Sequence, residues 1–161
     1  MQLSDTALKE RIREWRSEGK TIVFTNGCFD LLHRGHVEYL NTAKKQGDVL
    51  IVGINSDRSV KALKGPDRPL VGEEDRAFII GQLKAVDATI LFDEDTPHRL
   101  IDDVRPQVLV KGGDYTPAQV VGKDIVEKYG GRVVIVPLTP GKSTTGLLQK
   151  IIAKDNPHAN I

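Results

Sequence analysis

Short runs of apolar residues alternate along the chain with segments in which apolar positions recur every three or four residues. The runs are rich in β-branched residues and end at turn-forming residues, which is typical of strands buried on both faces of a sheet. Strands are predicted over residues 21–25, 48–55, 88–92, 107–111 and 132–136. Helices are predicted over residues 36–46, 57–63, 73–86, 97–104, 120–129 and 143–153. This alternation predicts one α/β domain with a five-stranded parallel sheet and helices on both faces.

A further helical pattern precedes the first strand. Ser4 or Asp5 can cap this helix, and apolar residues follow at helical spacing: Leu8, Ile12 and Trp15. We expect their face to pack on the domain or to contact another subunit. The predicted organisation is an N-terminal helix within residues 1–20, the domain over residues 21–153 and a frayed tail over residues 154–161.

Composition narrows the class of protein. Of the 161 residues, 39% are hydrophobic and 28% are charged, which is ordinary for a globular protein and unlike a disordered or membrane protein. The net charge of +1 gives no broad attraction to nucleic acid or to an anionic membrane. A single cysteine excludes an internal disulfide, and no apolar run approaches the ~20 residues that cross a bilayer. We expect a cytoplasmic protein without a secretory signal.

The stretch from Thr25 to His36 carries the clearest chemistry. Asn26-Gly27 breaks the first strand, since both residues tolerate a positive φ. His33 and His36 then lie three positions apart, where a helix begins. Both imidazoles and the free N–H groups of that helix can face one anion, so the stretch predicts a phosphate site.

Polar loops follow four of the five predicted strands. They cover residues 26–36, 55–57, 111–115 and 137–145. Right-handed crossovers place the carboxyl ends of all parallel strands at one edge of the sheet, where ligands of open α/β sheets bind. We therefore expect these four loops to meet in one cleft.

The motif Asn26-Gly27-x-Phe29-Asp30, followed by His33-x-Gly35-His36, resembles the nucleotidyltransferases that carry the H-x-G-H signature. The similarity extends over about residues 21–152 and is strongest to the heptose-1-phosphate adenylyltransferases. It implies a single Rossmann-like, doubly wound domain. It also implies adenylyl transfer from ATP to D-glycero-β-D-manno-heptose 1-phosphate, giving ADP-heptose and pyrophosphate for lipopolysaccharide synthesis.

The resemblance implies further components of the reaction. Mg²⁺ would arrive with the triphosphate, because this ion keeps several waters and binds few protein carboxylates. The family favours a homo-oligomer, and a separate heptose kinase would supply the sugar phosphate. No nucleic-acid or membrane partner is expected.

The resemblance also assigns roles to individual residues. The catalytic set is His33, His36 and Lys44, with the imidazoles on the α- and β-phosphates and the lysine on the triphosphate. The nucleotide-binding set is Asn26, Gly27, Cys28, Phe29, Asp30, Gly35, Lys111, Gly113, Asp114, Ser143, Thr144 and Thr145. The acceptor-binding set is Asp57, Arg76 and Tyr115. No side chain is assigned as a metal ligand of its own.

Simpler roles stay open for several of these residues. One histidine can merely pack, and Ser143 can be a plain N-cap. Lys44 can lie on a solvated helix face. Asp30 can orient the turn, help to hold magnesium or form an Asx-turn. Asp57 and Arg76 can be purely structural.

Two other functions also stay open. One is a glycerol-3-phosphate cytidylyltransferase, a branch that usually carries an arginine shortly before its Ser-Thr-Thr. Residues 138–142, Leu-Thr-Pro-Gly-Lys, lack that arginine, although Lys142 can replace part of its charge. The other is a nucleotide-binding module without catalysis, which needs affinity for ATP but no stabilisation of a transition state.

Overall fold

The computed structural model describes residues 1–113, 116–137 and 139–155. Its centre is a sheet of five strands: β1 (Ile22–Gly27), β2 (Val49–Asn55), β3 (Ala88–Phe92), β4 (Val108–Gly112) and β5 (Arg132–Val136). The strand order is β3-β2-β1-β4-β5, and every neighbouring pair is parallel. The predicted five-stranded parallel sheet of a Rossmann-like fold is confirmed.

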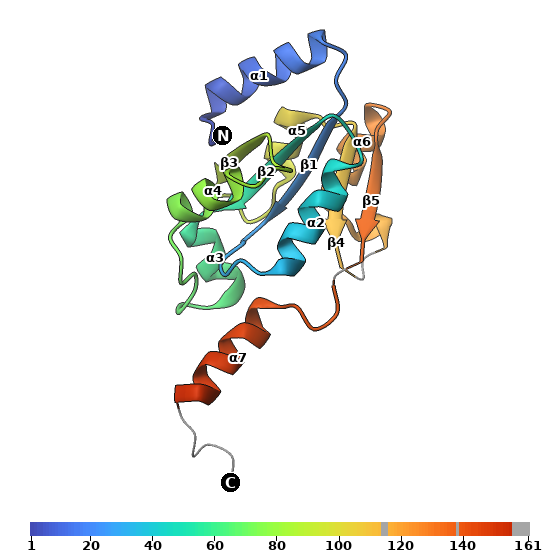
Figure 1. Ribbon diagram of the computed structural model, residues 1–161. Coiled ribbons are helices and arrows are strands. Elements are labelled where there is room, and N and C mark those ends of the chain that lie inside the picture. The colour runs from blue at the N-terminus through green and yellow to red at the C-terminus, as the bar shows by residue number, and fades with distance from the viewer. Residues whose placement is uncertain (114–115, 138, 156–161) are drawn as a thin grey trace.

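Helices cover both faces of the sheet (Figure 1). They are α1 (Asp5–Ser17), α2 (Arg34–Lys44), α3 (Asp57–Lys64), α4 (Glu73–Gly81), α5 (His98–Val104), α6 (Lys123–Lys128) and α7 (Thr144–Asp155), with a short 3₁₀ helix, η1 (Pro117–Gln119). Buried side chains of α1, α5 and α6 share one apolar cluster with the sheet, whereas those of α2 and α4 share a second cluster. Alternate strand residues supply the two clusters: in β1, Ile22 and Phe24 belong to the first and Val23 to the second.

The N-terminal helix α1 is capped as predicted by Ser4, whose Oγ accepts a hydrogen bond from the Ala7 N–H at 3.4 Å. Leu8, Ile12 and Trp15 are only 2%, 3% and 4% exposed and belong to the first apolar cluster. Their predicted packing role is confirmed. The alternative that this face contacts another subunit is wrong, because the chain's own core already covers it.

The residues before α1 pair with the sheet, which the sequence pattern does not predict. The Leu3 N–H donates to the Thr89 carbonyl at 2.9 Å, and the Thr89 N–H donates to the Met1 carbonyl at 2.9 Å. This parallel bridge covers the outer edge of β3, where unpaired backbone groups would otherwise be exposed. The N-terminal segment is therefore part of the domain.

Several helix boundaries differ from the predicted ones; α6, for example, begins at Lys123 rather than at residue 120. α2 begins at Arg34 rather than at residue 36, so His36 lies inside the first turn and His33 is the N-cap. α4 ends at Gly81 rather than at residue 86. The apolar spacing continues past the end of α4 because Ala85 and Val86, which lie in the turn after this helix, are also buried in the core.

The C-terminal helix α7 extends away from the sheet and the other helices (Figure 1). It runs to Asp155, so residues 154 and 155 belong to this helix and not to the predicted tail. Residues 156–161, the remainder of that tail, lie outside the described residues. Neither α7 nor any other helix of the described ranges is long and apolar enough to cross a membrane.

Candidate active site

A cleft of about 580 Å³ opens at the carboxyl edge of the sheet. Its floor is the end of β1, and its walls come from segments far apart in the sequence. Predicted site residues in its lining are Asn26, Gly27, Cys28, Phe29, Asp30, His36, Lys111, Thr144 and Thr145. Asn55, at the end of β2, lines it as well. The predicted meeting of the loops after β1, β2, β4 and β5 is therefore confirmed.

A smaller hollow of about 170 Å³ adjoins this cleft. Residues 26–29, His36 and Lys111 line both spaces. The smaller hollow is completed by Gly35, Tyr39, Gly112, Thr139 and Lys142. Two ligands that occupied the two spaces would therefore meet beside His36 and Lys111.

The two histidines lie face to face at the start of α2. Their ring centroids are 3.8 Å apart, with an angle of 17° between the ring planes. The His33 backbone N–H donates to Nδ1 of His36 at 3.4 Å. Because Nδ1 accepts this bond, the proton of the neutral His36 ring sits on Nε2, which is then a hydrogen-bond donor.

Both imidazoles are neutral at pH 7 in the free protein. Burial, with a further contribution from neighbouring His33, lowers the pKa of His36 to about 4. Burial and the charge of Lys142 also lower the pKa of His33. Within the described residues, the buried Nδ1 of His33 has no hydrogen-bond partner. His36 therefore offers a neutral Nε2–H donor where the two hollows join, whereas His33 lines neither hollow and its Nδ1 is buried.

Two glycines make room for this arrangement. A Cβ at position 27 would lie 2.9 Å from Cε2 of Phe29, whose backbone has a left-handed φ of 49°. A Cβ at position 35 would lie 3.0 Å from Nδ1 of His33 and 3.1 Å from Cβ of Lys142. The predicted break of the strand at Asn26-Gly27 is wrong, because both residues belong to β1 and the left-handed residue is Phe29. Gly27 instead leaves room for the Phe29 ring, and Gly35 keeps the first histidine close to the loop before α7.

The start of α7 contacts the histidine turn, which is the segment of residues 28–36 between the end of β1 and the first turn of α2. Ser143 is the N-cap, since its Oγ accepts a hydrogen bond from the Gly146 N–H at 3.0 Å. The Thr144 hydroxyl donates to the Leu31 carbonyl at 3.4 Å. Thr144 and Thr145 line the larger cleft, so the positive end of the α7 dipole lies at this site beside that of α2.

The end of β4 supplies a cationic side chain to the site. Lys111 is half-buried and lines both hollows, and its burial lowers the pKa of its ammonium group. The Gly113 N–H donates to the Val136 carbonyl at 3.1 Å, which ties the ends of β4 and β5 together. Gly113 itself is absent from the lining of either hollow. The predicted residues Asp114 and Tyr115 lie outside the described residues.

The Asp30 carboxylate is buried and fully engaged. Its Oδ1 accepts the N–H groups of Leu70 and Val71 at 2.8 and 2.9 Å, and its Oδ2 accepts from Nε of Arg68 at 2.6 Å. Burial alone would raise the pKa of Asp30, but these hydrogen bonds outweigh it and lower the pKa. Asp30 therefore anchors the loop before α4 to the histidine turn. A role as a magnesium ligand does not fit these contacts.

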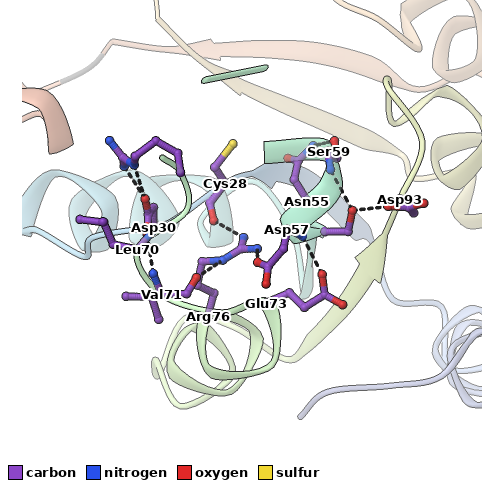
Figure 2. Close-up of polar contacts among 12 residues, drawn as sticks. Cys28, Asp30, Asn55, Asp57, Ser59, Leu70, Val71, Glu73, Arg76 and Asp93 are labelled. Atoms are coloured by element: carbon purple, nitrogen blue, oxygen red, sulfur yellow. Dashed lines mark hydrogen bonds and ion pairs between the residues drawn. The ribbon is translucent and has the colours of Figure 1, made fainter. Parts of the chain in front are cut away.

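The prediction that Arg76 binds the acceptor phosphate is wrong. Arg76 is 1% exposed, and its guanidinium donates to the carbonyls of Val71 and Cys28 at 2.9 and 2.6 Å (Figure 2). Its third nitrogen donates to Oδ1 of Asp57 at 2.8 Å. All three nitrogens are thus used inside the protein, and neither Arg76 nor Asp57 lines the cleft. The purely structural role left open for both residues fits: they link the histidine turn to α3 and α4.

The prediction that Lys44 reaches the triphosphate is also wrong. Its Nζ donates to the Asp48 carbonyl and pairs with Oδ2 of Asp87 at 2.6 Å. Both partners directly precede strands, β2 and β3, so Lys44 lies at the opposite edge of the sheet from the cleft. Because a helix rises ~1.5 Å per residue, position 44 is about 12 Å from His36 along α2.

The cytidylyltransferase-like family model matches residues 24–161, a range that contains the histidine turn and the strands that form the cleft. The chain belongs to the cytidylyltransferase-like family. The predicted resemblance to H-x-G-H nucleotidyltransferases is therefore confirmed at the level of the family.

Curated relatives of this cytidylyltransferase-like chain include two proteins named "Bifunctional protein HldE". That of Geobacter metallireducens is 60% identical over 137 residues, which are 85% of this chain and 28% of the relative. That of Geotalea uraniireducens is 59% identical over 145 residues, 90% of this chain and 30% of the relative. The chain thus spans under a third of their length. A solved structure, the lipopolysaccharide core biosynthesis protein from Thermoplasma volcanium GSS1, superposes with a TM-score of 0.62 at 33% identity, covering 75% of this chain and 98% of that one.

Several cleft residues of this family member were not singled out from the sequence. They are Asn55, Lys64, Arg68, Asp95, Thr96 and Gln119. Asn55 had a signal, because it lies in one of the predicted polar loops. Lys64 and Arg68 lie in a segment noted only for its charge and proline content. Asp95 and Thr96 follow β3, the strand to which no site loop was assigned.

Proposed function

We propose that the chain transfers an adenylyl group from ATP to D-glycero-β-D-manno-heptose 1-phosphate, forming ADP-heptose and pyrophosphate. The observation that carries this proposal is the position of His36, whose ring lines both hollows beside Lys111. A nucleotide and a second phosphate bound there would have their reacting groups at one paired histidine site. The lipopolysaccharide core biosynthesis protein among the relatives supports a role in that pathway.

The proposed reaction needs no general base. A sugar phosphate is already anionic near neutral pH, because its second pKa is about 6. One of its oxygens attacks the α-phosphorus of ATP. The bond from that phosphorus to the bridging oxygen of the β-phosphate breaks as the new P–O bond forms, and pyrophosphate leaves with the electron pair.

The protein's task in this proposal is to align the two phosphates and to stabilise the added negative charge. His33 and His36 donate hydrogen bonds to the α- and β-phosphates, and the N-termini of α2 and α7 add positive potential. Lys111 lies at the same junction. Each preorganised donor of this kind is worth about 3 kcal/mol of the barrier.

Mg²⁺ enters the proposal as part of the ATP substrate. Across the described ranges, no three His, Cys, Asp or Glu side chains are grouped to hold a metal ion. An ion that keeps its waters and takes its oxygens from phosphates fits such a site. In the same proposal the chain works in the cytoplasm as a homo-oligomer, and a heptose kinase supplies the acceptor.

Pyrophosphate release across nucleotide and acceptor pairs tests the proposed function. We expect turnover with ATP and the heptose phosphate, and little with CTP or with glycerol 3-phosphate. Turnover confined to CTP and glycerol 3-phosphate would replace the proposal with a cytidylyltransferase. A wild-type protein that binds ATP but releases no pyrophosphate with any pair, and whose ATP binding persists in His36→Ala, would indicate a non-catalytic module.

A further inference from the structure

The loop between β3 and α5 forms a wall of the larger cleft. It contains three consecutive carboxylates, Asp93, Glu94 and Asp95, of which only Asp95 lines the cleft, together with Thr96. Lys64 and Arg68 line the same space from the end of α3 and the loop after it. The cleft therefore has one anionic side chain on this loop and two cationic ones on another segment.

Two of the three carboxylates hold the loop in place. The Asp93 carboxylate accepts a hydrogen bond from the Ser56 hydroxyl and pairs with Nε of Arg58 at 2.8 Å (Figure 2 shows Asp93 beside the start of α3). Glu94 pairs with Nε of Arg99 at 2.7 Å. These contacts attach the loop to α3 on one side and to α5 on the other, so the position of Asp95 is fixed by its neighbours.

The Asp95 carboxylate itself has no hydrogen bond or ion pair within the described part of the chain. The two arginines that reach this loop, Arg58 and Arg99, pair with Asp93 and Glu94 and not with Asp95. A carboxylate repels a phosphate, so Asp95 does not suit the phosphate of a ligand. It does suit hydroxyl groups, because two carboxylate oxygens can accept hydrogen bonds from adjacent hydroxyls of a sugar.

The cationic side chains complement this role. Nε and Nη2 of Arg68 are used by Asp30, which leaves Nη1 directed to no partner among the described residues. Lys64 likewise has no ion pair there. A sugar phosphate in the cleft is thus oriented by charge, with its phosphate toward the cations and the histidines and its hydroxyls toward Asp95.

We infer that Asp95 is the specificity residue for the acceptor and that it selects a polyhydroxylated sugar phosphate by accepting hydrogen bonds from its hydroxyls. This inference rests on the proposed function, and it places the sugar hydroxyls of the acceptor in the part of the larger cleft that Asp95 lines. It also gives a reason why an acceptor without sugar hydroxyls would be used poorly.

Binding of two probes to wild type, Asp95→Asn and Asp95→Ala tests the inference without turnover. The probes are D-glycero-β-D-manno-heptose 1-phosphate and inorganic phosphate, titrated by calorimetry. Because hydrogen bonds to a charged group are worth more than neutral ones, we expect Asp95→Ala to weaken heptose phosphate binding roughly tenfold to a hundredfold. Binding of inorganic phosphate stays equal or becomes tighter, since a repulsive charge is removed.

The matched control is Asp75→Asn, which removes an exposed carboxylate on α4 that lies outside the cleft and should bind both probes as wild type does. Heptose phosphate binding as tight in both Asp95 variants as in wild type would overturn the inference. Equal loss of both probes would also overturn it, because a distorted cleft and not lost hydroxyl contacts would then be the cause.

Kinetics separate this inference from the proposed function. If wild type turns over, Asp95→Ala should raise the KM for the heptose phosphate with little change in the KM for ATP. If wild type releases no pyrophosphate yet heptose phosphate binding depends on Asp95, the proposed function fails and the inference stands. Normal turnover with an unchanged acceptor KM in both variants rejects the inference alone.

Discussion

At the scale of single residues, the histidine pair shows how burial prepares a phosphate site. Two imidazolium rings would repel each other at a centroid distance of 3.8 Å, whereas two neutral rings can stack there. Burial supplies that neutrality by lowering the pKa of His36 to about 4. The free site therefore carries donors without the cost of burying two unpaired charges.

The depressed pKa of His36 predicts a pH dependence of stability. The unfolded chain takes up the His36 proton near its ordinary pKa of about 6.5, whereas the folded chain does so only near pH 4. The unfolded state thus binds more protons between these values, and the free energy of unfolding falls as the pH falls from 6.5 toward 4. Urea denaturation at pH 7.5 and 5.5 should show a loss of about 1 kcal/mol that His36→Gln largely removes. An equal loss in the variant would contradict this.

Arg76 predicts a large effect on stability from a residue outside the cleft. Arg76→Ala removes three hydrogen bonds from a side chain with 0% exposure and leaves the Asp57 carboxylate without its partner. Three lost hydrogen bonds of about 1 kcal/mol each give a cost of about 3 kcal/mol. Chemical denaturation measures this loss in the free energy of unfolding, with Arg99→Ala as the control. The exposed pair of Arg99 with Glu94 should cost under about 1 kcal/mol, and a similar cost for both variants would refute the structural role of Arg76.

At the scale of elements, the apolar pattern was sufficient for the strands, because each buried strand is a short apolar run. It was less reliable for helix ends. Val86 extends the helical spacing of α4 although it is buried from a turn. The apolar pattern also did not predict that Leu3 pairs with the edge of β3, since that contact depends on which strand lies at the edge of the sheet.

The length of α2 decides the role of Lys44. Its ammonium pairs with Asp87 at the far end of this helix from His36. We expect Lys44→Met to leave kcat and the KM for ATP within about twofold of wild type, with a loss of about 1 kcal/mol in stability. Lys111→Met is the contrasting variant and should raise the KM for ATP. Steady-state kinetics on both variants measure these effects. A large rise in the KM for ATP or a large fall in kcat in Lys44→Met would restore the predicted catalytic role of Lys44.

At the scale of the whole molecule, the sequence predicted where the site lies better than which side chains form it. The carboxyl edge of the sheet follows from topology, and the H-x-G-H motif lies in one continuous stretch. The role of Arg76 depends on burial, which requires the packing of α4 against the histidine turn. Asp95 becomes visible only when the partners of Asp93 and Glu94 are known.

The most direct test of the central claim is the turnover of His36→Ala with ATP and the heptose phosphate, measured as pyrophosphate release. If the paired imidazoles stabilise charge on the reacting phosphates, kcat should fall by about a hundredfold to a thousandfold while ATP binding changes little. His33→Ala should behave similarly, and Lys44→Met serves as the control at the far end of the same helix. A His36→Ala variant that retains kcat within a few-fold of wild type would contradict the claim.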